Sequence, residues 1–271
     1  MSARNNQANK AAARDRLRAE RERQAKKDRT RRQVVVAGSV VVVLAIAAGV
    51  GYGVMQLNKP SHWEAAKKDS VVAPKNTSGP DGTTVTIGKA SAKKTLEMYE
   101  DPRCPICATF DQTVGPTVQK DLDAGKFKIQ YIGATFIDNA ASGGEGSKNG
   151  LSALGAALNV SPTAFEHYKT AMYSTKWHPD ETTDTFKNDA YLIKIAQTVP
   201  ELKDNKVFQK AVNNGTYDAW AMKMSAKFDK SGVQGTPTLK MDGKKLTTPG
   251  SDNAPLTVPT FNSALDKALK A

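Results

Sequence analysis

The sequence predicts an α/β domain with an inserted helical segment, preceded by a single N-terminal transmembrane helix. Three observations predict this architecture. An uncharged apolar run follows a basic arm, short β-type segments stand on both sides of a long helical block, and the two cysteines of the chain stand where a helical pattern begins. Period-two alternation of apolar residues indicates strands, whereas recurrence every three to four positions indicates helices.

The basic arm comprises residues 1–32 and carries a net charge of +8, two thirds of the chain's total of +12. Such an arm can bind nucleic acid, but this one ends at Arg32, directly before an apolar run. Lys and Arg beside a membrane span are retained on the cytoplasmic side. We therefore interpret the arm as a topology signal and expect no nucleic-acid partner.

The apolar run, residues 33–57, contains no charged residue, and roughly 20 apolar residues suffice to cross a bilayer. We predict a single-pass signal anchor in a bacterial cell membrane, with a cytoplasmic N-terminus and an extracytoplasmic catalytic domain. A cleaved signal peptide is the alternative, because Ala45-Ile46-Ala47 resembles a cleavage site. The long basic arm and the continuation of the run to Met55 favour the uncleaved anchor.

Residues 58–82 are rich in Lys, Ser, Pro, Asn and Gly. This composition is typical of a linker that cannot bury a core. We expect it to hold the folded domain, residues 83–271, clear of the bilayer.

The domain begins with two predicted strands, 83–87 and 95–99, and the second leads directly into Cys104. Apolar residues then recur every four positions, which predicts a helix with one buried face and a kink at Gly115-Pro116. Alternation over 127–131 predicts a third strand.

A helical block of about residues 147–230 follows a Gly-rich stretch and includes a helix start at Ser161-Pro162. Strand patterns return at 238–241 and 244–247, joined by Asp242-Gly243, a dipeptide typical of hairpin turns. A last helix is predicted from residue 258 to the C-terminus.

The two cysteines stand together in Cys104-Pro105-Ile106-Cys107, so the chain has no structural disulfide framework. A cysteine at a helix N-terminus has a lowered pKa and becomes a better nucleophile, which assigns the attacking role to Cys104. Pro105 suits the first helical turn. Cys107 lies one turn further along the same face and is the predicted resolving thiol.

A zinc half-site and an incidental pair are the alternatives to a redox pair. Zinc usually takes four ligands, and the three histidines, His62, His167 and His178, are not at paired-ligand spacing. We therefore expect no metal, and no cofactor other than a redox-active Cys104–Cys107 disulfide. His178 is interpreted as a loop or packing residue rather than as a catalytic base.

A second motif, Gly232-Val233-Gln234-Gly235-Thr236-Pro237-Thr238, stands directly before the first C-terminal strand. Together with the Cys-Pro-x-Cys motif and the helical block between them, it resembles the DsbA-like branch of the thioredoxin superfamily over residues 83–270. The resemblance implies a thioredoxin-like fold with an inserted helical lobe. It also implies a cis Thr236-Pro237 bond in a loop, Val233, Gly235, Thr236 and Pro237, that packs on the redox pair and binds substrate.

The sequence departs from the resembled family at one position. Many relatives carry a buried acid, a proton relay, six residues before the first cysteine, where this chain has Met98. We place Glu97 and Glu100 on the opposite strand face from Met98. Proton transfer to Cys107 is left to Glu97, to a bound water or to no dedicated group.

These observations predict a thiol–disulfide oxidoreductase that forms or isomerises disulfides in exported proteins with cysteine thiols. A membrane redox partner would regenerate it. The Pro105-Ile106 dipeptide differs from the Gly-Pro of reducing thioredoxins but does not fix the direction of electron flow. A disulfide reductase for a dedicated client and a non-enzymatic, membrane-tethered peptide-binding module remain as alternatives.

Overall fold

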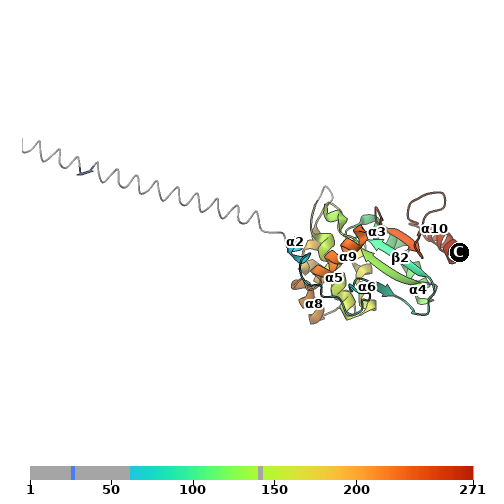
Figure 1. Ribbon diagram of the computed structural model, residues 1–271, viewed down its shortest axis with the longest axis horizontal. Coiled ribbons are helices and arrows are strands. Elements are labelled where there is room, and N and C mark those ends of the chain that lie inside the picture. Colours follow the sequence, from blue (N-terminus) through green and yellow to red (C-terminus); the bar gives the residue numbers. More distant parts are fainter. Residues whose placement is uncertain (1–25, 28–61, 140–142, 271) are drawn as a thin grey trace, which may run out of the picture. The chain divides into compact units, whose positions relative to one another are not determined.

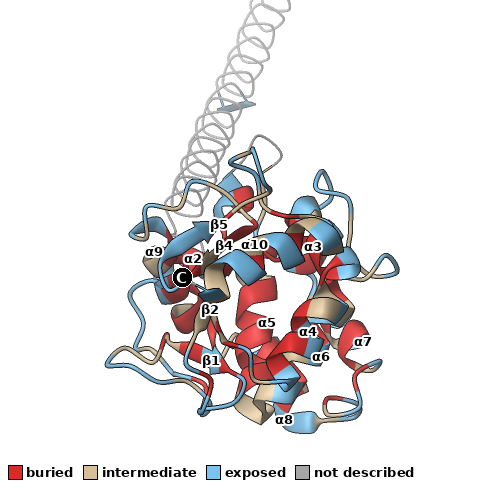
Figure 2. Ribbon diagram, turned by 90° about the vertical axis from the view of Figure 1, so that its right-hand side faces the viewer, coloured by how far each residue is buried: buried red, intermediate tan, exposed pale blue. Residues whose placement is uncertain are grey.

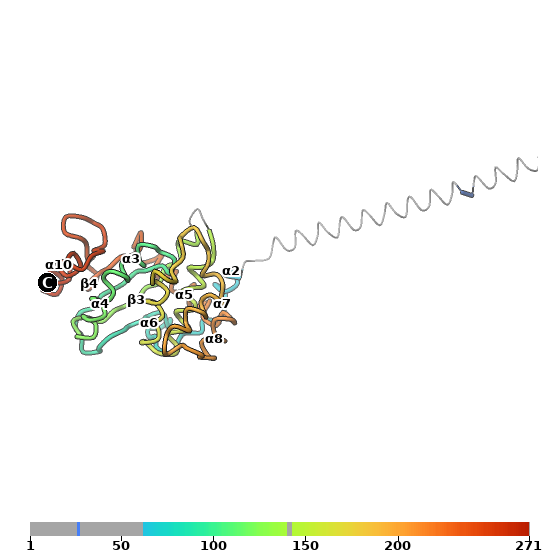
Figure 3. The backbone as a smooth tube through the Cα atoms, turned by 180° about the vertical axis from the view of Figure 1, so that it is seen from behind, coloured from blue at the N-terminus to red at the C-terminus, as the bar shows by residue number. Residues whose placement is uncertain are grey.

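The structure is a computed structural model that describes residues 26–27, 62–139 and 143–270 (Figures 1 and 3). The chain divides into two compact units, residues 1–60 and 61–271. The predicted basic arm and membrane anchor lie in the first unit, outside the described residues except for 26–27, which are helical. Within the described ranges, no helix combines the length and the apolar character that a membrane span requires.

The second unit contains a five-stranded sheet in the order β1-β3-β2-β4-β5. Its strands are β1 (Val85–Ile87), β2 (Thr95–Glu100), β3 (Lys128–Gly133), β4 (Thr238–Met241) and β5 (Lys244–Leu246). The central strand β2 pairs parallel with β3 and antiparallel with β4. This arrangement brings the C-terminal end of β2, which leads into the cysteine motif, beside the start of β4.

The β4–β5 hairpin confirms the turn that the sequence predicts. Asp242 and Gly243 both have positive φ, 48° and 81°, as a type I′ turn requires. The Asp242 carboxylate also accepts a hydrogen bond from the Thr95 backbone N–H at 3.0 Å. The turn is therefore joined to the start of β2.

One face of the sheet is covered by α3 (Pro105–Thr113), α4 (Gly115–Asp123) and α10 (Val258–Lys270) (Figure 2). Phe110 of α3 packs edge-to-face on Phe261 of α10, with ring centroids 6.2 Å apart. The kinked single helix that the sequence predicts is instead two helices that meet at Val114. The second helix begins at Gly115-Pro116 because proline lacks the N–H group of a continuing helix.

A helical lobe lies between β3 and β4 in the sequence, close to the insertion expected from the sequence. It contains α5 (Gly146–Val160), α6 (Pro162–Tyr173), α7 (Asp189–Ala196), α8 (Lys206–Asn213) and α9 (Asp218–Asp229), with the 3-10 turns η1 (Phe136–Asn139) and η2 (Thr185–Lys187). Helix α5 is buried along most of its length, as Figure 2 shows, and forms the centre of the lobe. Ser161 caps α6 by accepting a hydrogen bond from the Ala164 N–H at 2.9 Å, which explains the helix start predicted there.

Residues 62–82 pack against the lobe, so the linker expected at 58–82 is corrected over this range. Helix α2 (His62–Ala66) buries Trp63, which is 5% exposed, in a small apolar cluster with Met222 of α9. Further along, the Trp220 indole N–H donates to the Gly82 carbonyl at 2.8 Å. Composition predicted a linker because one tryptophan contributes little to an average but much to burial.

Candidate redox site

Cys104 caps the N-terminus of α3 with its own sulfur. Its backbone is extended, and Sγ accepts a hydrogen bond from the Cys107 N–H at 3.3 Å. Pro105 is the first helical residue, so the N–H group that it lacks is not needed there. The two cysteines are reduced thiols, 4% and 0% exposed. The helix therefore presents Cys104 at its positive end and buries Cys107 one turn further in.

The two thiols have opposite pKa shifts. The pKa of Cys104 is lowered, mainly by the hydrogen bond from the Cys107 thiol, with further lowering by Thr236, while burial and the Asp101 charge act against it. The pKa of Cys107 is raised, mainly by burial and also by its interactions with Cys104 and Glu100. Cys104 is therefore the thiol of the pair that ionises first, and Cys107 retains its proton.

The loop before β4 meets the cysteine motif. The Thr236-Pro237 bond is cis, and the Cys104 Sγ–H donates to the Thr236 carbonyl oxygen at 3.4 Å. The Thr236 hydroxyl is buried and has no hydrogen-bond partner. Gly235 lies in the same loop, where its carbonyl accepts a hydrogen bond from the Thr238 hydroxyl at 2.8 Å. Val233, further from the sulfurs along the chain, packs on the edge of the main core.

The surface around the pair is partly apolar. Ile106, between the cysteines, is 47% exposed, and Phe136 of η1 is 37% exposed. The Phe136 ring stacks on Phe228 of α9 at 5.8 Å. Beside it, Ile137 packs in the same buried cluster as both cysteines. Two large exposed apolar side chains thus belong to the segments that form the site.

A buried acid, Glu100, lies at the end of β2, and the sequence analysis misplaced it. Period two puts Glu100 on the same strand face as Met98, not on the opposite face as expected. Glu100 is 0% exposed, and burial raises its pKa. Glu97 does lie on the other face, where it accepts a hydrogen bond from the Tyr99 hydroxyl at 2.7 Å. Strand parity was the signal that could have identified Glu100.

Lys169 of α6 links Glu100 to the redox helix. Its Nζ lies 3.4 Å from a Glu100 carboxylate oxygen and 2.6 Å from an Asp111 carboxylate oxygen of α3. Neither Glu100 oxygen accepts a hydrogen bond, so this ion pair is its main favourable polar contact. The nearby Tyr131 hydroxyl is also buried without a partner. No sequence pattern predicted Lys169, because its partners are 58 and 69 residues away in the chain.

A second buried acid, Asp101, stands three residues before Cys104. Its carboxylate accepts hydrogen bonds from the Ser147 hydroxyl at 2.6 Å, the Arg103 N–H at 2.9 Å and the Ile137 N–H at 3.2 Å. Burial nevertheless raises its pKa to about 7. Asp101 thereby connects the segment before the redox pair to η1 and to α5.

The remaining candidate ligands lie apart from the site. The His178 ring packs between Tyr173 and Phe186, with centroids at 5.7 and 5.9 Å, and burial lowers its pKa. This is the packing role expected of it. Across residues 26–27, 62–139 and 143–270, no group of three or more His, Cys, Asp or Glu side chains is arranged to hold a metal.

Comparison with known proteins gives consistent similarities. Residues 80–267 match the family model described as thioredoxin. The chain is 26% identical over 189 residues to a probable disulfide bond formation protein D of Bacillus cereus, covering 69% of this chain and 80% of that protein. It is 24% identical to disulfide bond formation protein D of Bacillus subtilis, covering 59% and 68%.

Solved structures show the same likeness. The reduced DsbA of Mycobacterium tuberculosis superimposes with a TM-score of 0.53 at 25% identity, covering 69% of this chain and all of that one. Oxidised BdbD of Bacillus subtilis gives 0.58 at 20% identity, covering 74% and all of that chain, a likeness of fold.

Proposed function

The chain belongs to the thioredoxin family, and from this premise we propose how its cysteine pair acts in disulfide formation. It is a protein-disulfide oxidoreductase of the DsbA type, as its similarity to disulfide bond formation proteins and to a DsbA structure indicates. We assign the chemistry to Cys104 and Cys107. The observation that carries this assignment is the asymmetry of the pair, with a lowered pKa at Cys104 and a raised pKa at Cys107.

The reaction begins from the oxidised pair. A client thiolate attacks Cys104 Sγ, forming a mixed disulfide while the Cys104–Cys107 bond breaks and its electron pair leaves on the Cys107 sulfur. A second client thiolate then attacks the client sulfur of the mixed disulfide, and Cys104 leaves as a thiolate. The client loses two electrons and the enzyme gains them. The low pKa of Cys104 makes it the better leaving group in this second step.

Cys107 leaves into a buried site and requires a proton there. Glu100 is the acid placed to supply it, because burial raises its pKa and keeps its proton available. A cleft of about 1030 Å³ opens beneath α3, and its lining includes Asp111, Tyr131 and Lys169. We propose that Glu100 recovers its proton from water through this cleft, with Lys169 holding the carboxyl group in place.

The client peptide would lie across the exposed motif residue Ile106 and the loop before β4. In this proposal the backbone groups of Val233, Gly235 and Thr236 bind the client beside its cysteine, with Pro237 fixing the end of the loop. Phe136 adds an exposed apolar ring near the pair. Clients would then be recognised in an extended, partly unfolded state.

We also propose that the enzyme is anchored in the cell membrane by residues 33–57 and acts on exported proteins on the outer side. The apolar run and the basic arm before it support this placement. Regeneration requires a second disulfide-bearing redox partner that takes two electrons from the reduced pair.

The test uses the purified full-length chain, oxidised, with a reduced two-cysteine protein as client. We expect stoichiometric client oxidation, abolished in Cys104→Ser, and a trapped mixed disulfide at Cys104 in Cys107→Ala. Equilibration with glutathione buffers should give a reduction potential above the thioredoxin value of about −270 mV. A value at or below it would assign the reductase function instead. Full client oxidation by a Cys104→Ser/Cys107→Ser variant would show that the pair is not the redox centre.

A further inference from the structure

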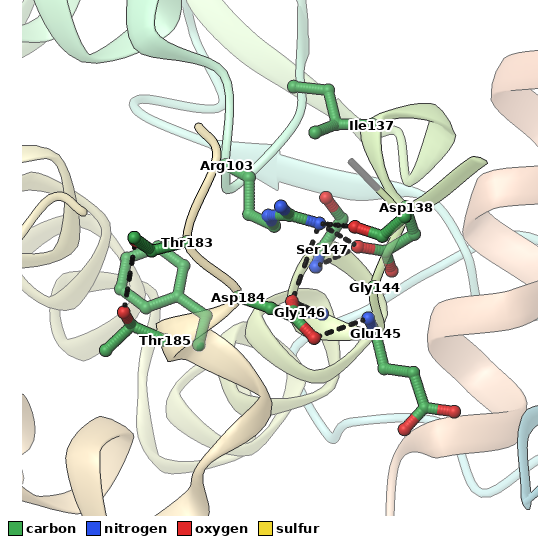
Figure 4. A network of polar contacts seen from close by, with 12 residues as sticks. Arg103, Ile137, Asp138, Gly144, Glu145, Gly146, Ser147, Thr183, Asp184 and Thr185 are labelled. Atoms are coloured by element: carbon green, nitrogen blue, oxygen red, sulfur yellow. Dashed lines mark hydrogen bonds and ion pairs between the residues drawn. The ribbon is translucent and has the colours of Figure 1, made fainter. Parts of the chain in front are cut away.

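A buried arginine stands directly before the first cysteine of the pair. The Arg103 side chain is 1% exposed, and its Nη1 lies 2.9 Å from Asp138 and 3.5 Å from Asp184, between the two carboxylates (Figure 4). Nη1 also donates to the Gly143 carbonyl at 2.9 Å, and Nη2 donates to the Glu181 carbonyl at 2.8 Å. One side chain thus joins the redox segment to two separate loops of the lobe.

The two acids that pair with Arg103 also cap helix α5, the centre of the lobe. Asp184 and Asp138 together accept hydrogen bonds of 2.8 to 3.1 Å from the four backbone N–H groups at this helix end, those of Glu145, Gly146, Ser147 and Lys148. A helix N-terminus leaves four N–H groups without intrahelical partners. All four are paired here, so the two carboxylates hold the end of α5 in a fixed position relative to Arg103.

Arg103 has the chemistry that this position requires. Two carboxylates close together and largely buried repel each other unless a cation lies between them. The planar guanidinium offers several donors at fixed angles, so one side chain can bind two acids and two carbonyl groups at once. Lys148 places a second cation 3.1 Å from Asp138, but it belongs to α5 and has no covalent link to the redox segment.

The segment from Asp101 to Arg103 is therefore fixed to the lobe at both ends. Asp101 binds the Ser147 hydroxyl of α5, and Arg103 binds the loops described above. We infer that Arg103 is a positioning residue for Cys104, holding its sulfur against the Cys107 N–H and the Thr236 loop. The inference deepens the proposed function, because it concerns how the same redox pair is set for exchange.

The reactivity of Cys104 should be sensitive to this restraint. Its sulfur makes two contacts, 3.3 Å to the Cys107 nitrogen and 3.4 Å to the Thr236 oxygen. Both are near the outer range of hydrogen bonding to sulfur, so a small displacement of the segment would weaken them. Cys104 would then lose part of the hydrogen bonding that favours its thiolate.

The test measures the pH dependence of Cys104 alkylation in the reduced full-length chain, with the modified residue identified by mass spectrometry. Arg103→Lys keeps the charge but not the fork. Arg103→Gln/Asp138→Asn removes both charges, so that no unpaired charge is left buried. Lys148→Met is the matched control, because it removes a cation from the same Asp138 without touching the redox segment. Thermal unfolding of each variant shows which of them remain folded at the assay temperature.

Both Arg103 variants should raise the alkylation midpoint by at least about half a pH unit, a rate loss of about threefold below the midpoint. Lys148→Met should lower thermal stability but leave the midpoint unchanged. Wild-type midpoints in the folded Arg103 variants, or an equal shift in Lys148→Met, would overturn the positioning role. Alkylation does not require a client, so failure of wild-type client oxidation would contradict the proposed function separately.

Discussion

The sulfur of Cys104 lies 3.4 Å from the carbonyl oxygen of Thr236, a residue 132 positions further along the chain. The contact spans the whole helical lobe in sequence, so it forms only when β2 and β4 pair in the sheet. The Thr236 hydroxyl beside it is buried without a partner in the thiol state. It is thus available to donate a hydrogen bond once Cys104 ionises, in agreement with its lowering of the Cys104 pKa.

Thr236→Val should make Cys104 less acidic. A hydrogen bond to a charged group contributes about 1.5 kcal/mol or more, so alkylation below the midpoint should slow roughly tenfold. The alkylation rate against pH gives the shift directly. Thr248→Val, in the loop after β5, serves as a control that should react like the wild type. An unchanged midpoint in Thr236→Val would show that its hydroxyl does not bind the thiolate.

Glu100→Gln should slow the attack of client thiols on the oxidised enzyme by at least about tenfold, because Cys107 would leave without its proton donor. It should also lower the pKa of Cys107, since the Glu100 charge contributes to raising it. Stopped-flow kinetics of client oxidation against pH measure the first effect. Glu166→Gln is the control, because burial also raises the pKa of Glu166, to about 7, but it is not among the groups acting on Cys107. Equal slowing in both variants would contradict a specific role for Glu100.

Lys169→Met should destabilise the fold. It leaves Glu100 and Asp111 buried without their cation, and removing one partner of a buried ion pair costs about 3–5 kcal/mol. Urea unfolding of the full chain gives the free energy. Lys169→Met/Asp111→Asn should recover part of the loss, because one unpaired charge is then removed. A loss below about 1 kcal/mol in the single variant would mean that water replaces the ammonium group.

Asp101→Asn should change how stability depends on pH. The folded pKa of Asp101 is raised to about 7 from 3.8. Between these values the folded state binds a proton that the unfolded state has lost, so the wild type loses stability as pH rises. The loss attributable to Asp101 approaches about 1.4 kcal/mol per pH unit. The variant lacks this term, so its free energy of unfolding should improve relative to the wild type from pH 4 to 7. Parallel curves would refute the shift.

Trp63→Ala should destabilise the domain by about 3 kcal/mol, because truncating a large buried aromatic residue leaves a cavity. Urea unfolding measures the loss, and Val72→Ala is the control, since Val72 is 49% exposed and its truncation should cost under about 0.5 kcal/mol. Equal small losses in the two variants would support the linker expected from composition.

The sequence predicted the parts of the fold that rest on local patterns. The β4 strand has the bounds that alternation predicts, and the Asp242-Gly243 turn and the Ser161 helix cap follow from the preferences of those residues. In each case the backbone conformation is determined within a few residues, so the pattern carries the information. The same holds for the placement of Cys104 at a helix N-terminus.

The parts that sequence could not supply depend on contacts between distant segments. Lys169 is one lysine among many until α6 packs against α3 and β2, and Arg103 acquires its partners only when two lobe loops close around it. Trp63 lies in a stretch whose composition is that of a linker, yet Met222 of α9 gives it a place to pack. The error at Glu100 was different, because correct strand parity would have avoided it.

The docking of α2 bears on how far the enzyme can reach. With the predicted membrane span ending at residue 57, residues 58–61 alone would connect it to the docked helix, and four extended residues cover at most about 14 Å. A free tether over 58–82 would allow about 85 Å. A short leash of this kind would confine the working radius of the cysteine pair to a thin layer beside the bilayer, where newly translocated chains emerge.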